Sequence, residues 1–266
     1  MTEYFEGPRL KLNRAQEHIH ELQQVLIDFI ATKPYRINYK LNSDQTFYEC
    51  RVYYDGRTPP SQIGILIGEI VYQLRSVLDH IIFELSVPQI RQIVDREAQI
   101  RATAVPQFPI LTKRNERELS KRLKFVDKLV WDAVERYQPY DRTYSSDPTK
   151  HPLSLLQRLS NADKHRVIAT TVGGIRLAPS EKLANGVEME RGRNVDDGEV
   201  IARVPAHLDP KQHFGPNLIV DILFDNAREP GIIRPITNVM EIHNFVRYEM
   251  LPYFTNVASQ LSSSTK

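Results

Sequence analysis

The chain has 266 residues, of which 41% are hydrophobic, and its 35 lysines and arginines against 33 aspartates and glutamates give a formal net charge of +2. This length supports a substantial hydrophobic core, and the near balance of charge excludes a chain that binds nucleic acid or anionic membranes through its overall charge. The single cysteine, Cys50, excludes an internal disulfide and a cysteine-based zinc site, and it suits a reducing compartment.

The first elements in chain order are a helix and a β-hairpin. The helix is predicted to begin near Asn13, a good N-cap residue, and to end before Pro34. Its apolar residues recur at alternating spacings of three and four, the pattern of a coiled-coil seam. Apolar and polar residues then alternate over residues 35–41 and 48–54, with turn-forming residues between them. This alternation predicts two antiparallel strands that share one apolar face.

A long helix is predicted over residues 61–85, because its aliphatic residues gather on one face at 100° per residue. The same stretch is interrupted by charged residues, and residues 1–9 lack the apolar core of a signal peptide. We therefore expect a cytoplasmic protein with no membrane span. Pro88 suits the first turn of a shorter helix over residues 88–101.

The rest of the chain changes from helices to strands and back to a helix. Periodicity and turn residues predict helices over 114–121, 126–137 and 152–165, strands over 167–177, 186–190, 200–204 and 218–224, and a last helix over 237–259. Asp197-Gly198 is a plausible hairpin turn, and Pro252 is expected to kink the last helix.

Together these elements predict an α+β fold, a mostly helical bundle with an antiparallel β layer formed by strands in residues 35–54 and 167–225. We expect one domain covering residues 1–266. Its predicted segments are residues 8–33, 61–165 and 236–260 for the bundle, and residues 34–60 and 166–235 for the β layer.

The first candidate site lies on the predicted helix 61–85. A polar stripe flanks the apolar face and consists of Glu69, Gln73, Ser76, His80 and Glu84. Arg75 and Asp79 form an i,i+4 pair further round, opposite the apolar face. One interpretation is the ordinary solvated side of a helix. The other is a histidine with a carboxylate one turn away, which suits proton transfer or a metal site.

The second candidate site lies near the end of the predicted helix 152–165. Arg158, Asn161 and His165 are three and four residues apart, so they share one stripe. Asp163 falls close to the apolar side, where a carboxylate is costly unless it is paired. The alternative is a plain C-terminal turn whose basic residues complement the helix dipole.

Two motifs carry a resemblance to known proteins. They read Leu-Arg-Ser-Val-Leu-Asp-His at residues 74–80 and Leu-Ser-Asn-Ala-Asp-Lys-His-Arg at residues 159–166, with Phe108-Pro109-Ile110 between them. Over most of its length the chain resembles a family of uncharacterised bacterial proteins, which implies no activity. More distantly it is similar to HEPN-type helical proteins, whose motif is an arginine, four to six residues, then a histidine. Arg75 with His80, and Arg158 with His165, match that spacing.

The HEPN-type resemblance implies a helical bundle of a kind that is often dimeric and of which many members are metal-independent ribonucleases. In such a site His165 would transfer the proton, Arg158 would hold the phosphate and Asn161 would orient them. The full set of candidate residues is His165, Arg158, Asn161, Asp163, His80, Arg75 and Asp79. The chain departs from that family in the residue after each motif arginine and in its strands after residue 166. The implied partners are RNA and a second copy of the chain, without a cofactor.

Two other classes of function stay open. The chain is a non-catalytic binding or interaction protein if both clusters are structural. It is a metal-binding bundle if His80 with Glu84, or Asp163 with His165, supplies ligands from facing helices. Residues 113–124 hold six basic and two acidic side chains, which form either a solvated helix face or a contact for RNA phosphates.

Overall fold

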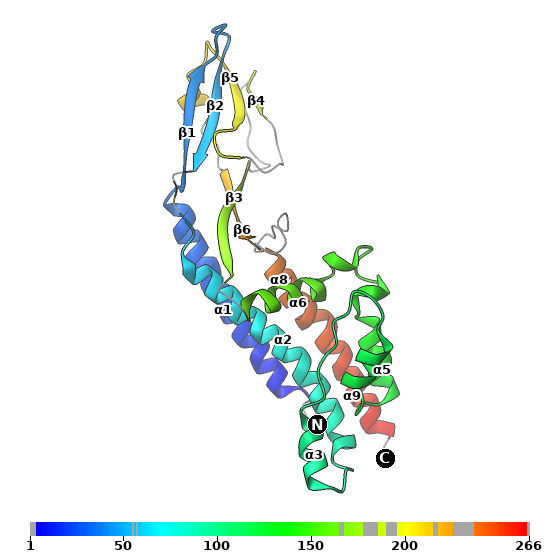
Figure 1. Ribbon diagram of the computed structural model, residues 1–266. Helices are drawn as coiled ribbons and strands as arrows, with labels where there is room; N and C mark the ends of the chain where they lie inside the picture. Colours follow the sequence, from blue (N-terminus) through cyan, green and yellow to red (C-terminus); the bar gives the residue numbers. More distant parts are fainter. Residues whose placement is uncertain are drawn as a thin grey trace. The chain divides into compact units, whose positions relative to one another are not determined.

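The structure is a computed structural model that describes residues 4–54, 56, 58–164, 168–177, 186–189, 196–214, 218–225 and 237–264 (Figure 1). The chain divides into two compact units. The helical unit comprises Met1–Glu21, Ile65–Val167 and Thr237–Lys266, and the sheet unit comprises Leu22–Gly64 and Ile168–Ile236. The elements confirm a mostly helical α+β fold, and the single domain stays a prediction.

Among the described residues, the two longest helices are α1 (Glu6–Ala31) and α2 (Ser61–Ile90). The prediction that the first helix begins near Asn13 is wrong, because α1 begins at Glu6. Pro8 fits there, since the first turn of a helix leaves its N–H groups without intrahelical acceptors. Pro88 does not start a new helix; it lies inside α2, two residues before the end, where one missing hydrogen bond costs least.

The coiled-coil-like spacing of the first helix marks an internal seam. In the helical unit Leu12, Ala15 and Ile19 of α1 are buried, and so is the apolar face of α2. The fully buried residues of that face include Ile67, Ile70, Leu74, Val77, Leu78 and Ile81. Each such side chain contributes about 1.5–3 kcal/mol through burial. None of the helices in the described ranges is both long and apolar enough to cross a bilayer.

The C-terminal helix is interrupted, as its proline predicts. It consists of α8 (Thr237–Asn244), a π-helical segment η3 (Phe245–Met250) and α9 (Leu251–Ser264). The N–H of Leu251 bonds to the carbonyl of Val246, five residues back. Pro252 follows at once, and the wider turn accommodates a residue that has no N–H and crowds the carbonyl four residues before it.

Short helices connect these long ones. They are α3 (Arg96–Thr103), α4 (Glu116–Arg122), α5 (Lys128–Arg136), η1 (Pro139–Asp141), η2 (Pro148–Lys150) and α6 (Pro152–Asp163). Asp95, Asn115 and Asp127 cap α3, α4 and α5 by accepting backbone N–H groups of the first turn. Pro152 occupies the first turn of α6, as predicted.

The sheet unit holds two antiparallel sheets instead of one layer. The first has the order β1-β2-β5-β4, formed by β1 (Tyr35–Leu41), β2 (Phe47–Tyr54), β5 (Val200–Pro205) and β4 (Glu188–Met189). The predicted hairpin is therefore confirmed, and it pairs with a strand 152 residues later, with Cys50 opposite Ala202. The second sheet pairs β3 (Ala169–Leu177) with β6 (Leu218–Asp225).

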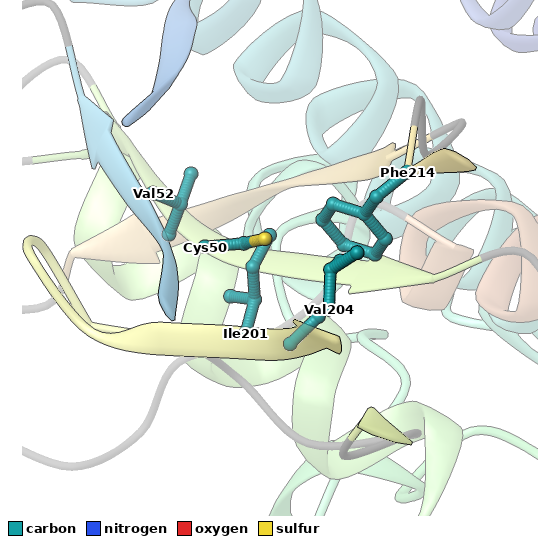
Figure 2. Packing of buried hydrophobic residues seen from close by; sticks show 6 residues of the cluster. Cys50, Val52, Ile201, Val204 and Phe214 are labelled. Carbon is teal, nitrogen blue, oxygen red and sulfur yellow. The ribbon is translucent and has the colours of Figure 1, made fainter. Parts of the chain in front are cut away.

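The first sheet buries one face, on which Cys50, Val52, Ile201, Val204 and Phe214 pack together (Figure 2). Phe214 follows the short helix α7 (Pro210–His213). Burial raises the pKa of the Cys50 thiol to about 12, so this cysteine is a protonated, structural core residue. Gly198, with φ of 78°, takes the left-handed position of the predicted turn before β5.

Candidate functional site

A pocket of about 550 Å³ lies within the helical unit, between α2, the extended segment 107–111, α4 and α6. The lining residues that matter for its chemistry are Tyr72, Arg75 and Asp79 of α2, Arg122 of α4, and Gln157 and Lys164 at α6. With Glu118, which also lines the pocket, its charged side chains are three positive and two negative. The residues of α2 are spaced by three and four, and so are Gln157, Ser160 and Lys164 at α6, so each element contributes one stripe.

Arg75 and Asp79 hold the backbone of Phe108 from both sides. Arg75 Nη2 donates to Asp79 Oδ1 at 2.9 Å and to the Phe108 carbonyl at 2.6 Å. Asp79 Oδ1 also accepts the N–H of Phe108 at 2.9 Å. This pair was expected on the solvated side of the helix. Segment 107–111 covers it instead, and the Arg75 and Asp79 side chains are only 19% and 29% exposed.

The surroundings of the Arg75 guanidinium disfavour its positive charge. Burial lowers its pKa, the pair with Asp79 opposes that shift, and the nearby charge of Arg122 adds to it. Its Nη1 is buried and has no hydrogen-bond acceptor within the described part of the chain. Arg75 is therefore a cation with unused donors and a like-charged neighbour.

Arg122 enters the pocket from α4 and is fixed by two neighbours. Its Nε donates to Glu118 Oε1 at 2.8 Å, one turn earlier, and its Nη1 donates to Gln107. The hydrogen bond from Arg122 lowers the pKa of Glu118, so this carboxylate is already engaged. Lys164 lies just past the end of α6 and is exposed. The acids of the pocket are thus tied to its arginines.

Gln138 binds the backbone of segment 107–111, which forms one wall of the pocket, and sequence analysis did not predict this role. It is 1% exposed; its Nε2 donates to the Pro109 carbonyl at 2.8 Å, and its Oε1 accepts the N–H of Leu111 at 3.0 Å. Segment 107–111 is thereby hydrogen-bonded to Arg75 and Asp79 at Phe108, and to Gln138 at Pro109 and Leu111. No periodic pattern marks Gln138, since it lies in the connection between α5 and η1.

His80 does not meet Arg75. It is exposed, and its Nδ1 lies 3.7 Å from where a Cβ on Gly7 of α1 would be. Burial and the charge of Lys11 lower its pKa. Glu84, one turn on, accepts the N–H of Phe5 at 3.2 Å. The first polar stripe thus faces the start of α1, whereas Arg75 faces Phe108.

The second cluster is only partly described. His165 lies outside the described residues. Asn161 is exposed and accepts from Gln157 Nε2 at 3.1 Å, and Arg158 is half-buried. A Cβ on Gly68 of α2 would overlap the Asp163 carboxylate, whose pKa is raised by burial. Of the candidate residues, the structure brings Arg75 and Asp79 to the pocket, together with Gln157 and Ser160 of α6 and with Lys164 just past its end.

A metal centre finds no support in the parts of the chain that the structure describes. They contain no group of three or more histidine, cysteine, aspartate or glutamate side chains placed to hold an ion. The residues recorded near His80 and Glu84 include Gly7, Phe5, Lys11 and Asp79, and the Asp79 carboxylate is engaged by Arg75 and by the N–H of Phe108. The alternative pair, Asp163 with His165, includes a residue outside the described ranges.

Comparison of the chain with family models, with curated proteins and with solved structures found no match in any of the three. The fold and the pocket define a mostly helical α+β protein with a cationic pocket in its helical unit. The two resemblances read in the sequence stay predictions. A functional proposal therefore rests on the geometry and charge of this pocket.

Proposed function

We propose that this protein is a binding protein whose α2–α6 pocket holds the phosphate group of a polar ligand. The observation that supports this most is the placement of Arg75 and Arg122, from two different helices, on one pocket where their charges repel each other. A bound dianion would remove that repulsion. The guanidinium of Arg75 lines the pocket, and a phosphate oxygen there would form a charge-assisted contact with it.

Phosphate fits this charge pattern better than a carboxylate. Arg75, Arg122 and Lys164 supply three positive charges, and the carboxylates of Asp79 and Glu118 are engaged by Arg75, Arg122 and the backbone of Phe108. Arginine forks match phosphate oxygens in pairs, while lysine adds a point charge at the rim. A ligand oxygen can also pair with the Ser160 hydroxyl, which lines the same pocket.

Calorimetric titration with inorganic pyrophosphate tests this proposal. We expect saturable binding by the wild-type chain, and a loss of affinity of about tenfold or more in Arg122→Gln and in Lys164→Gln, because each removes a charge-assisted hydrogen bond. Lys128→Gln is the matched control, since Lys128 is an exposed lysine on α5 outside the pocket. No saturable binding, or an equal loss in the control, would overturn the proposal.

A HEPN-like ribonuclease is a second proposal. It is supported by the two arginine–histidine spacings and by Arg122, which brings the basic segment 113–124 to the pocket. Its test is incubation of total RNA with the wild-type chain, His165→Ala and His80→Ala. Equal RNA loss in all three, or none in any, would refute it. An RNA partner, a homo-oligomer and a cytoplasmic location belong to this proposal as predictions.

A further inference from the structure

Tyr72 is the aromatic residue at the rim of the pocket. It lines the pocket beside Arg75 although 63% of its surface is exposed. The two residues are three apart on α2, so their Cβ atoms are about 5–6 Å from each other. An aromatic face therefore stands directly next to the cation that we assign to phosphate.

The ring of Tyr72 is also oriented by a neighbour. The ammonium of Lys11 on α1 lies over it, 5.9 Å from the ring centre. A cation over one face holds the ring by cation–π attraction and leaves the opposite face for a second partner. Planar rings stack on such faces with little regard to their substituents, because the attraction lies in the π surface.

We propose that the ligand is a phosphate ester that carries a planar ring, with the ring stacked on Tyr72 and the phosphate beside Arg75 and Arg122. This inference rests on the proposed function and adds the class of ligand to it. A cavity of about 550 Å³ falls within the range of small-molecule sites, about 300–1,000 Å³. The ring reaches the phosphate either directly, as in an aryl phosphate, or through a sugar, as in a nucleotide.

Three ligands separate these contributions in calorimetric titrations of the full chain. Ribose 5-phosphate has the phosphate and no planar ring, phenyl phosphate has both without a sugar, and adenosine 5′-monophosphate has both with a sugar between them. We expect at least one ring-bearing ester to bind about tenfold more tightly than ribose 5-phosphate. Whichever of the two binds more tightly identifies how the ring is attached.

Tyr72→Leu should remove that tenfold advantage and leave the affinity for ribose 5-phosphate unchanged. The matched control is Tyr248→Leu. Tyr248 is also 63% exposed and also lies under a cation, Arg247 at 5.9 Å, but it is on η3 and does not line the pocket. Circular dichroism and the thermal midpoint of each variant show whether the fold is intact.

The outcomes are distinct. If all three phosphates bind with equal affinity, the ring has no partner and this inference is wrong, while the phosphate site stands. An equal loss in Tyr248→Leu also overturns it, since the effect would then be general to exposed tyrosines. If none of the three esters nor pyrophosphate binds, the proposed function fails and this inference fails with it.

Discussion

Two of the buried nitrogens in the helical unit that have no hydrogen-bond partner among the described residues lie in opposite kinds of surroundings. One is Arg75 Nη1 at the pocket, and the other is His151 Nε2 at the start of α6. Arg75 stays charged, because a guanidinium is not deprotonated in proteins. His151 is fully buried, and burial lowers its pKa to about 4, so at neutral pH it carries no charge.

The surroundings of the two groups match these protonation states. His151 Nδ1 accepts the N–H of Leu153 at 3.1 Å as the N-cap of α6, and the ring packs edge-on against Phe245, 5.4 Å between ring centres. Aromatic rings enclose it, which suits a neutral structural group. Arg75 is instead beside a pocket, a second arginine and a lysine. Of these two unpartnered nitrogens, therefore, only that of Arg75 belongs to a charged residue that lines the candidate pocket.

The strongest test of this contrast removes the carboxylate partner of Arg75. Asp79→Ala leaves a largely buried guanidinium without its ion pair and the N–H of Phe108 without its acceptor. We expect the free energy of unfolding in urea to fall by about 4 kcal/mol. Asp132→Ala is the control, because Asp132 belongs to an exposed i,i+4 pair with Lys128 on α5.

The control should change stability by less than about 0.5 kcal/mol, as exposed pairs do. If Asp79→Ala costs no more than Asp132→Ala, the charge of Arg75 is solvated and its contrast with His151 disappears.

The second test is the pH dependence of stability contributed by His151. The pKa of His151 in the folded chain is about 4, below the ordinary value of 6.5. Between about pH 4 and 6.5, therefore, His151 is protonated in the unfolded chain and neutral in the folded chain. The contribution is fully present above about pH 6.5 and is lost as the pH falls towards 4. It amounts to about 3 kcal/mol from the pKa difference.

His151→Asn keeps a capping side chain and removes the titration. Urea unfolding of both proteins from pH 4 to 7 should show a steeper pH dependence in the wild-type chain. His243, whose pKa burial also lowers, titrates in both proteins and cancels in the difference. Parallel pH profiles would show that His151 is accessible to protons in the folded state.

A third and smaller effect concerns the hydrogen bonds that hold segment 107–111 to Gln138. Gln138→Ala leaves the Pro109 carbonyl and the Leu111 N–H without their partners, and we expect a loss of about 2 kcal/mol. Pyrophosphate affinity should fall as well, because segment 107–111 carries the backbone that orients Arg75. Gln99→Ala, which removes one weak bond to the Ile90 carbonyl at 3.4 Å, should change neither quantity appreciably.

Unchanged pyrophosphate affinity in a folded Gln138→Ala protein would show that the wall does not position Arg75.

Local patterns predict the elements well and their partners poorly. Alternation along residues 35–41 and 48–54 was enough to predict the hairpin and its apolar face, because side chains in strands alternate strictly. The pattern contains no information on which distant strand pairs with Tyr48–Arg51, and thus does not show that β3 and β6 form a sheet of their own. Two helix ends were predicted wrongly. Helix α1 begins at Glu6, with Pro8 in its first turn, and α2 continues past Pro88, because a proline is tolerated near a helix terminus.

The site shows the same limit. The helical wheel correctly placed Arg75 and Asp79 away from the apolar face of α2. It could not show that segment 107–111 would cover the pair, because what packs on a polar face depends on residues far along the chain. Tertiary packing also brings Arg122 to the pocket and Gln138 to its wall, and no sequence spacing links either residue to Arg75.

The smallest expected effect separates the pocket from the other candidate histidine. His80 is exposed and lies beside Gly7, so His80→Ala should change the free energy of unfolding by less than about 0.5 kcal/mol and leave pyrophosphate affinity as it is. Arg122→Gln, in contrast, should reduce that affinity about tenfold. Calorimetry on both variants decides the matter, since a ribonuclease centre built on Arg75 and His80 requires the histidine to contact the same phosphate. A loss of pyrophosphate affinity in His80→Ala would therefore join the two clusters into one site and favour RNA cleavage over binding alone.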